Sequence, residues 1–253
     1  MSKIKLSVII PAYNEEKNIN KGVLLDIWNY LKKQEYTWEV IFVDDKSTDA
    51  TLSLLRKFSE EHLGFLVLAE PHRGKGGSVI AGILKAEGDI VLFTDMDQAT
   101  PLKEVEKFLP KFENGYDIVI GSRKGRKGAP LVRRIMAYGF SVLRVVILGL
   151  PYKDTQCGFK AFTRKAAQKI FSRLKVFSDK EVSKGSHVTA GFDLEVLYIA
   201  RKLKLKTVEV TVNWEHRETE RINPVKDSLE GLKDLLKVRI NAFKGVYKDD
   251  NHV

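Results

Sequence analysis

Residues 39–61 read EVIFVDDKSTDATLSLLRKFSEE, and this stretch decides the fold class. Residues 39–43 are rich in β-branched side chains and predict a buried strand, which ends at Asp44 and Asp45. The polar residues 47–49 then offer caps for a helix over residues 50–61. A buried strand that passes within a few residues into a helix is the unit from which parallel α/β sheets are built.

The same alternation continues on both sides of this stretch. Strands separated by helices of this length predict an α/β fold, a mostly parallel sheet covered by helices on both faces. Ligands of such sheets bind outside the carboxyl ends of the strands, and polar residues follow four of the predicted strands. The further predicted strands are Lys5–Ile10, Phe65–Ala69, Asp89–Thr94 and Tyr116–Gly121, and the further helices are Val23–Lys33 and Ser78–Ala86.

The second half of the chain alternates less regularly. It predicts helices at Met136–Leu150, Gly191–Leu203 and Ser228–Phe243, and a strand at Thr207–Trp214. Residues 154–160 read as a polar loop. No linker-like segment separates the two halves, so we expect one domain over residues 1–253.

Composition limits the classes of protein that remain. The chain has 253 residues with a net charge of +10, which favours anionic partners such as nucleic acid, anionic lipid or phosphorylated substrates, or else a solvated basic surface. The single cysteine, Cys157, excludes an intramolecular disulfide. We expect no secretion signal and no membrane span, because the longest apolar run, Met136–Leu150, is interrupted by Arg144.

Carboxylates at two strand ends suggest the chemistry. Asp95 and Asp97 flank Met96 directly after a predicted strand. Oxygen ligands of this kind suit Mg²⁺ or Mn²⁺ held together with a diphosphate, although an isolated Asp-x-Asp is more often a pair of surface acids. Asp44 is either a turn residue or a hydrogen-bond acceptor for a nucleobase or ribose.

Three further segments are candidates for binding anions or sugars. Residues 73–77 (RGKGG) would let the backbone approach a phosphate, or would simply start a helix. Arg123 and Arg133 belong to an arginine cluster that could clamp phosphate oxygens, or to a solvated basic loop. In the loop 154–160, Asp154 could act as a general base or an orienting group and Gln156 could bind a sugar, whereas spacing alone would make this segment a turn.

The order of these motifs resembles that of the family 2 glycosyltransferases with the GT-A (Rossmann-like) fold. The shared motifs are VIIPAYNEE at 8–16, VDDKSTD at 43–49, RGKG at 73–76, DMD at 95–97 and GSR at 121–123. The segments DTQCGFK at 154–160 and WEHRE at 214–218 are similar to the dolichyl-phosphate β-glucosyltransferase branch of the polyprenyl-phosphate glycosyltransferases. The resemblance covers roughly residues 4–225 and implies a nucleotide-sugar-binding part at about 1–125. The acceptor-binding part, with a C-terminal amphipathic helix, would then occupy about 126–253.

For the donor half, the resemblance implies a nucleotide-sugar pocket and a metal position. Asp97 would hold the metal together with Asp95, which faces the ribose. Some related mannosyltransferases carry a further glutamine ligand where this chain has Ala99, and His216 is a candidate extra ligand or a structural histidine. The implied nucleotide-sugar-binding residues are Pro11, Ala12, Tyr13, Glu15, Asp44, Arg73, Lys75, Asp95 and Met96.

For the acceptor half, the resemblance implies that Arg123 and Arg133 meet the acceptor phosphate, with Asp154 and Gln156 at the sugar. The expected activity is inverting transfer of a hexose, glucose from UDP-glucose, to a polyprenyl phosphate at a membrane surface. GDP-mannose, another UDP-sugar, or a glycan or protein acceptor remain alternatives on the same fold. A nucleic-acid-binding module is disfavoured, because the chain has no recognition-helix or RNA-binding aromatic pattern.

The expected location is the cytoplasmic face of a membrane, with peripheral contact. The apolar segment 136–150 and the basic amphipathic segment 228–243 would lie on the membrane, or alternatively pack into the core. A separate membrane subunit or a second copy of the chain are further partners that this arrangement would allow.

Overall fold

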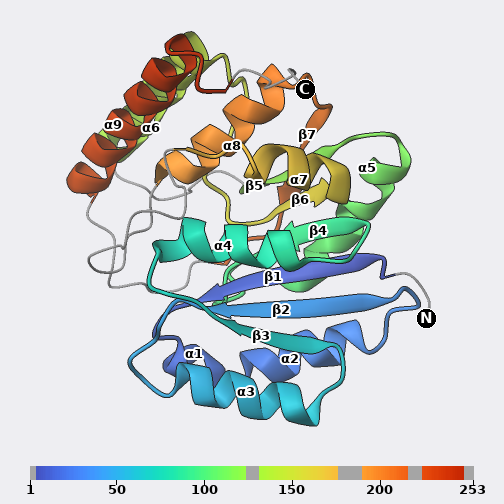
Figure 1. The fold of residues 1–253 in the computed structure, drawn as a ribbon. Coiled ribbons are helices and arrows are strands. Elements are labelled where there is room, and N and C mark those ends of the chain that lie inside the picture. The colour runs from blue at the N-terminus through green and yellow to red at the C-terminus, as the bar shows by residue number, and fades with distance from the viewer. Residues whose placement is uncertain (1–3, 124–130, 176–189, 216–223, 248–253) are drawn as a thin grey trace.

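The computed structural model describes residues 4–123, 131–175, 190–215 and 224–247. In these ranges a seven-stranded sheet runs through the molecule, with helices on both of its faces (Figure 1). The strands are β1 (Leu6–Ala12), β2 (Trp38–Asp44), β3 (Phe65–Ala69), β4 (Ile90–Phe93), β5 (Ile118–Arg123), β6 (Lys160–Thr163) and β7 (Thr207–Val212).

The sheet order is β3-β2-β1-β4-β6-β5-β7, and only β6 runs antiparallel to its neighbours β4 and β5. Each strand of the parallel half is followed by a helix, which carries the chain back so that the next strand runs in the same direction. The predicted α/β fold with a mostly parallel sheet is therefore confirmed.

A hydrophobic core lies on each face of the sheet. Alternate residues of β1 illustrate this, since Ile9 belongs to one core and Val8 and Ile10 belong to the other. Burial on both sides explains why these strands read as unbroken apolar runs rather than as alternating patterns. The first core is covered by α4 (Gly74–Lys85), α7 (Arg164–Phe171) and α8 (Ala190–Lys202), and the second by α1 (Glu16–Asn20), α2 (Val23–Leu31), α3 (Thr51–Glu61), η1 (Leu102–Lys107) and α5 (Leu109–Glu113).

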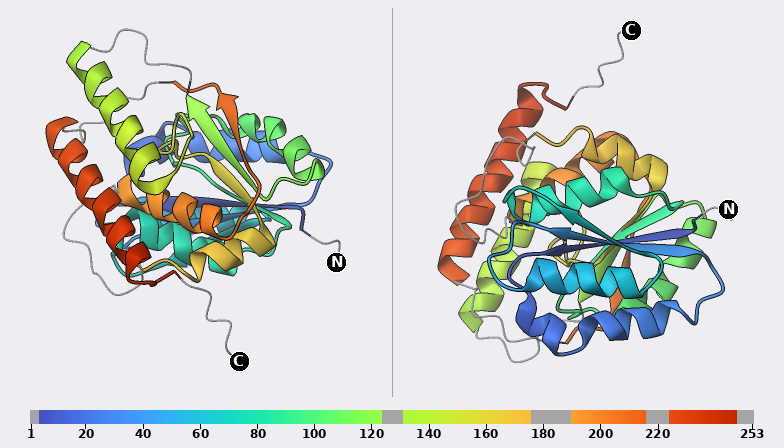
Figure 2. Two further views of the ribbon diagram at one scale, coloured as in Figure 1. Left: turned by 90° about the horizontal axis from the view of Figure 1, so that it is seen from above. Right: turned by 60° about the horizontal axis from the view of Figure 1, so that its bottom comes forward.

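The two remaining helices, α6 (Leu131–Leu148) and α9 (Pro224–Phe243), lie side by side at one end of the molecule (Figure 2). Helix α9 also packs along α8, through which it joins the first core. Its apolar residues divide between two faces: Leu235 and Val238 are buried, whereas Leu236, Ile240 and Phe243 are exposed. The single apolar stripe expected for residues 228–243 is thus only partly a core-facing stripe.

Most of the expected elements are present with no end shifted by more than five residues. The sequence pattern does not predict the short helices α1, η1 and α5, and the structure differs from it at two further places. Strand β6 and helix α7 occupy residues 160–171, where the sequence predicted the end of a polar loop and nothing further. Helix α4 begins at Gly74 rather than at Ser78, so most of the glycine-rich turn is the first turn of the helix. Both differences depend on partners far away in the sequence. Strand β6 pairs with β4 and β5, and the start of α4 is bound by Asp45.

Candidate active site

The loops that follow β1 and β2 are tied to each other at the carboxyl edge of the sheet. The backbone N–H of Asn14 donates to Ser47 Oγ at 3.0 Å, and the N–H of Thr48 donates back to Asn14 Oδ1 at 2.8 Å. Asn14 and Lys46 both have left-handed backbone conformations, with φ of 54° and 61°. Such conformations cost energy in residues other than glycine and persist where surrounding contacts impose them, which is common at binding sites.

Asp44 ends β2 inside this edge and is only 1% exposed. Its Oδ2 atom accepts a hydrogen bond from the N–H of Ser47 at 3.1 Å. Its Oδ1 atom is buried and has no hydrogen-bond partner among the described residues. A buried carboxylate oxygen without a donor is costly, so this atom fits a ligand that brings an N–H or O–H group.

Asp45 holds the start of α4 from outside the helix. Its two carboxylate oxygens accept the backbone N–H groups of Arg73 at 2.7 Å and Gly74 at 2.9 Å. Oδ2 also lies 2.8 Å from His72 Nδ1, and the His72 ring stacks on Tyr13 with centroids 4.5 Å apart. An acidic cap at a helix N-terminus is favourable electrostatically, and it starts α4 earlier than its own sequence predicts.

Lys75, in the first turn of α4, forms an ion pair with Asp95, which follows β4. Burial favours the neutral amine of Lys75, but the negative charges of Asp95, Asp193 and Asp97 outweigh that effect and raise its pKa. The chain passes very close to Asp95 on the other side, because a Cβ atom at Gly158 would fall 2.1 Å from Asp95 Oδ2. Any larger residue at position 158 would have to displace the Asp95 carboxylate.

Asp97 lies in the turn that follows Asp95, where its Oδ1 atom accepts the N–H of Ala99 at 2.9 Å. Gln98 between them is in the left-handed region, with φ of 50°. Within the described ranges, no three His, Cys, Asp or Glu side chains form a group that could hold a metal ion. The side chains of Arg133 and His216 lie outside the described residues.

Arg123 and Asp154 form a two-pronged ion pair at the end of β5. The Nε atom of Arg123 donates to Asp154 Oδ2 at 2.6 Å, and Nη2 donates to Oδ1 at 2.9 Å. Burial opposes ionisation of Asp154, but the hydrogen bonds and charge of Arg123 outweigh it and hold the pKa of the carboxyl below its usual value. The guanidinium also lies over the Trp214 ring, 5.6 Å from its centroid.

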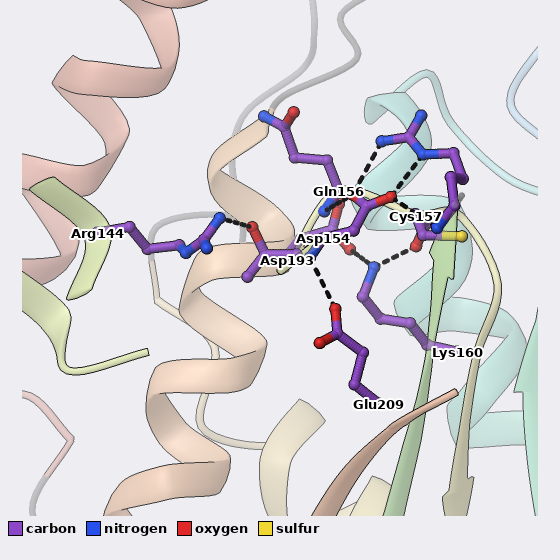
Figure 3. A network of polar contacts seen from close by, with 9 residues as sticks. Arg144, Asp154, Gln156, Cys157, Lys160, Asp193 and Glu209 are labelled. Atoms are coloured by element: carbon purple, nitrogen blue, oxygen red, sulfur yellow. Dashed lines mark hydrogen bonds and ion pairs between the residues drawn. The ribbon is translucent and has the colours of Figure 1, made fainter. Parts of the chain in front are cut away.

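The sequence missed a second ion pair beside this one. Lys160 is 0% exposed, and its Nζ atom donates to the carbonyl of Cys157 and, at 2.6 Å, to Asp193 Oδ1 (Figure 3). Asp193 stands in the first turn of α8. Its signal in the sequence was an acid inside a helix that is otherwise largely apolar, but nothing in the sequence named its partner.

The contacts of the described residues thus connect several of the predicted site residues in pairs. Lys75 pairs with Asp95 and Arg123 pairs with Asp154, while the backbone of Arg73 is bound by Asp45, which the sequence did not single out as a site residue. Gln156 is exposed, and its backbone N–H donates to Asp154 Oδ1 at 3.2 Å.

Four other predicted residues play more local parts in the described structure. Met96 packs into the core beneath α1–α3, and Ala12 is buried in the same core. Pro11 is half-buried at the end of β1. Glu15 accepts a hydrogen bond from Asn18 Nδ2 at 2.6 Å.

A surface beside the site combines exposed apolar side chains with a buried charge. On α6, Val142, Val145 and Val146 are 43%, 42% and 76% exposed, whereas Arg144 between them is 4% exposed. None of the helices in the described ranges is long and apolar enough to cross a bilayer. We call the exposed apolar side chains in the described parts of α6 and α9 the α6/α9 apolar surface. Its residues are Tyr138, Val142, Leu143, Val145, Val146, Leu236, Ile240 and Phe243.

Comparison with known proteins extends these observations. Among curated relatives, a dolichyl-phosphate beta-glucosyltransferase of Dictyostelium discoideum is 34% identical over 267 residues, which cover 98% of this chain and 78% of the relative. A protein of the same name from Homo sapiens is 34% identical over 266 residues, with 96% and 78% covered.

A solved structure with the same fold is glucosyl-3-phosphoglycerate synthase from Mycobacterium tuberculosis in complex with Mn²⁺, UDP and glucosyl-3-phosphoglycerate. It matches with a TM-score of 0.60 at 18% identity, over 94% of this chain and 80% of its own, which is a likeness of fold alone. The family model described as Glycosyl transferase family 2 matches residues 7–171. With that match over more than half of its length, the chain belongs to glycosyl transferase family 2.

Proposed function

We propose that the protein is an inverting glycosyltransferase that moves glucose from UDP-glucose to a polyprenyl phosphate of the dolichyl type at a membrane surface. The observation that carries this proposal is the similarity to dolichyl-phosphate beta-glucosyltransferases over 98% of the chain, which includes both halves of the site. The geometry of the described residues supports each part of the reaction in turn.

The nucleotide would bind at the ends of β1 and β2. The unpartnered Oδ1 atom of Asp44 suits a base that presents a ring N–H group, as uracil does. The Tyr13–His72 stack near Asp45 offers a flat aromatic surface at the same edge of the sheet. Guanine also presents ring N–H donors, so the donor must be identified by experiment.

Mg²⁺ or Mn²⁺ would bind at Asp97, with Asp95 beside it and the donor diphosphate completing the ligand set. The residues fit such a cation, because the two carboxylates of Asp95 and Asp97 follow the same strand, β4. When bound, the metal supplies positive charge that stabilises the departing diphosphate. Lys75 would add a second positive charge on the same side.

The acceptor phosphate would approach from the side of Arg123 and Arg133. The contacts of Arg123 with Asp154 use Nε and Nη2. Nη1 makes no hydrogen bond within the described ranges and could donate to a phosphate oxygen. A phosphate monoester is largely dianionic at neutral pH, because its second pKa is about 6, and so needs no base. This agrees with a lowered pKa for Asp154, which makes its carboxylate a weak base but a firm anchor for Arg123.

The α6/α9 apolar surface would rest on the membrane that holds the acceptor lipid, on its cytoplasmic face. Its exposed apolar residues are accompanied on α9 by Lys233, Lys237 and Arg239, with Lys244 following the helix. Apolar residues beside lysines suit the interface of a bilayer with anionic headgroups. Peripheral contact of this kind would bring a long polyprenyl chain to the acceptor side of the site.

The activity is tested by incubating the protein with Mn²⁺, a short polyprenyl phosphate and, in parallel, UDP-glucose, UDP-galactose, UDP-N-acetylglucosamine or GDP-mannose. Mass spectrometry then detects the glycosylated lipid. We expect a hexose to be added with UDP-glucose, and little or no product with GDP-mannose or with Asp97→Asn. Preferential use of GDP-mannose, or transfer to a free hydroxyl acceptor instead of the phosphate, would contradict the proposal.

A further inference from the structure

Arg144 is a buried cation on a helix whose neighbouring apolar residues face solvent. Moving a guanidinium out of water costs several kcal/mol unless the protein provides hydrogen bonds in return. Arg144 is 4% exposed while the valines on either side of it are at least 42% exposed. Because this helix buries its arginine and exposes its valines, we expect the guanidinium to bind specific groups in the interior.

The contacts of Arg144 show what that use is. Its guanidinium donates to the carbonyls of Leu150 (from Nε, 3.3 Å) and Tyr152, and to Thr155 Oγ1 (from Nη1, 3.3 Å). A fourth contact, from Nη2 to Ser141 Oγ at 2.9 Å, lies within α6 itself. Three of the four acceptors therefore belong to residues 150–155, here called the acceptor loop.

The acceptor loop is held from its other side as well. On β7, Glu209 accepts the backbone N–H groups of Lys153 at 3.0 Å and Asp154 at 2.7 Å. The loop thus lies between Arg144, which donates to its carbonyls, and Glu209, which accepts its N–H groups. Figure 3 shows Asp154 between Arg144 and Glu209, with the hydrogen bond to Glu209 drawn. Asp154, whose backbone is held in this way, accepts a hydrogen bond from Arg123 through its side chain.

No carboxylate forms an ion pair with Arg144 among the described residues. The negative charges that act on it from a distance are Asp154, which belongs to the loop, and Glu209 on β7. Burial lowers the pKa of Arg144, yet a guanidinium remains charged at any physiological pH. Three of its four hydrogen bonds thus hold the conformation of one loop.

We propose that Arg144 is a positioning residue that fixes the acceptor loop, and through it Asp154 and Arg123, in the geometry needed for glucose transfer to the lipid phosphate. This inference rests on the proposed function. Because α6 presents its exposed valines on the side away from Arg144, the same residue joins the α6/α9 apolar surface to the reacting groups. A displacement of about 1 Å in such a support can cost on the order of 100-fold in rate.

The fork of an arginine is required for this role. The Arg144 contacts use three nitrogen atoms that point to acceptors in different directions. A lysine ammonium has the same charge but only three donors on one atom, and it reaches less far. Arg144→Lys therefore keeps the buried charge and removes most of the hydrogen bonds to the acceptor loop. The variant thus distinguishes an effect of loop position from an effect of charge.

The test compares Arg144→Lys and Arg144→Gln with Arg201→Gln. Arg201 is a matched control, because its Nη1 atom donates to the carbonyl of Leu148, at the end of α6 and outside the acceptor loop. For each protein we would measure Tm, the Kd for UDP with Mn²⁺, the kcat for transfer to polyprenyl phosphate, and backbone hydrogen exchange in a peptide that spans residues 150–157.

We expect both Arg144 variants to lose about tenfold or more in kcat while their Kd for UDP stays within about twofold of the wild type. Exchange in the peptide 150–157 should accelerate in both, and Arg201→Gln should match the wild type in kcat and exchange. If Arg144→Gln does not fold, Arg144→Lys decides the result.

Unchanged exchange at 150–157 in Arg144→Lys would overturn the inference, as would a loss of kcat no greater than that of Arg201→Gln. If the wild type transfers no glucose at all, the proposed function has failed. The exchange measurement then still decides whether Arg144 holds the loop.

Discussion

At the scale of single residues, Asp44 is the most sharply defined group in the donor half. Its Oδ2 atom accepts the backbone N–H of Ser47, whereas its Oδ1 atom is buried and accepts no hydrogen bond among the described residues. Burial of such an atom is tolerated where a ligand completes it, because an unsatisfied polar atom in the interior costs on the order of 1–3 kcal/mol. The lack of a donor at Asp44 Oδ1 is therefore better explained by nucleotide binding than by a role in folding.

Replacing Asp44 by asparagine should weaken UDP binding by about 10- to 100-fold, because the hydrogen bond to a charged acceptor contributes about 1.5–3 kcal/mol. Isothermal titration calorimetry with UDP and Mn²⁺ measures the change. Asp117→Asn serves as the control, since Asp117 precedes β5 at the opposite edge of the sheet, where its carboxylate accepts the backbone N–H of Lys206. Equal affinities for wild type and Asp44→Asn would remove Asp44 from the nucleotide site.

The Arg123–Asp154 pair makes a prediction about acid stability. The folded-state pKa of Asp154 is lowered, so its ionised form contributes stability that is present above its unfolded pKa, about 3.9, and is lost as pH falls through the folded value. Asp154→Asn should therefore be less stable than the wild type at pH 7, and the difference should shrink below about pH 4. Urea unfolding at a series of pH values tests this, and a difference independent of pH down to pH 2 would contradict it.

At the scale of elements, α6 and α9 form a pair whose outer face is apolar and whose inner face carries contacts to the site. Helix packing alone would bury the larger apolar residues, yet Val146 and Phe243 are each 76% exposed. Contiguous apolar side chains at this exposure indicate a surface that meets a partner. The neighbouring lysines on α9 favour an anionic bilayer as that partner.

A double variant, Val146→Glu with Phe243→Glu, should weaken binding to vesicles that contain anionic lipid by about tenfold or more, since burial of each original side chain is worth about 1.5–3 kcal/mol. Vesicle flotation measures the bound fraction. Leu63→Glu is the matched control, because Leu63 is 96% exposed and follows α3, well away from α6 and α9 in Figure 1. Should the double variant float as well as wild type, the α6/α9 apolar surface would need another partner.

At the scale of the whole molecule, the two halves of the site are assembled by the strand order. Strands β1, β2 and β4 place Asp44 and Asp95 at one edge, and the antiparallel β6 brings residues 154–160 back beside them. Lys75 joins the halves electrostatically, since it pairs with Asp95 and also lies in the field of Asp193. Ligand binding at this junction should therefore stabilise the entire fold.

UDP together with Mn²⁺ should raise Tm by about 5–10 °C at a ligand concentration of 100 Kd, which corresponds to about 2.7 kcal/mol for a domain of this size. UDP with EDTA should give a smaller shift. In Asp97→Asn the two conditions should give the same shift, because the metal-dependent part is lost. A full Mn²⁺-dependent shift in Asp97→Asn would show that the cation binds elsewhere.

The sequence by itself determined the parallel α/β half of the sheet, because each strand there is a short apolar run followed by a helix. It also determined which carboxylates stand at strand ends, since Asp44 and Asp95 are fixed by their distance from the last apolar residue. Those features depend on the local spacing of apolar and polar residues, which can be read directly from the sequence.

Only the tertiary structure decided how those residues are paired. Strand β6 is four residues long and exists because β4 and β5 lie on either side of it. Helix α4 starts at Gly74 because Asp45 caps it from another strand. The partners of Arg123, Arg144 and Lys160 depend on long-range contacts that no local pattern encodes, so the sequence could name the charges at the site but could not say which of them would meet.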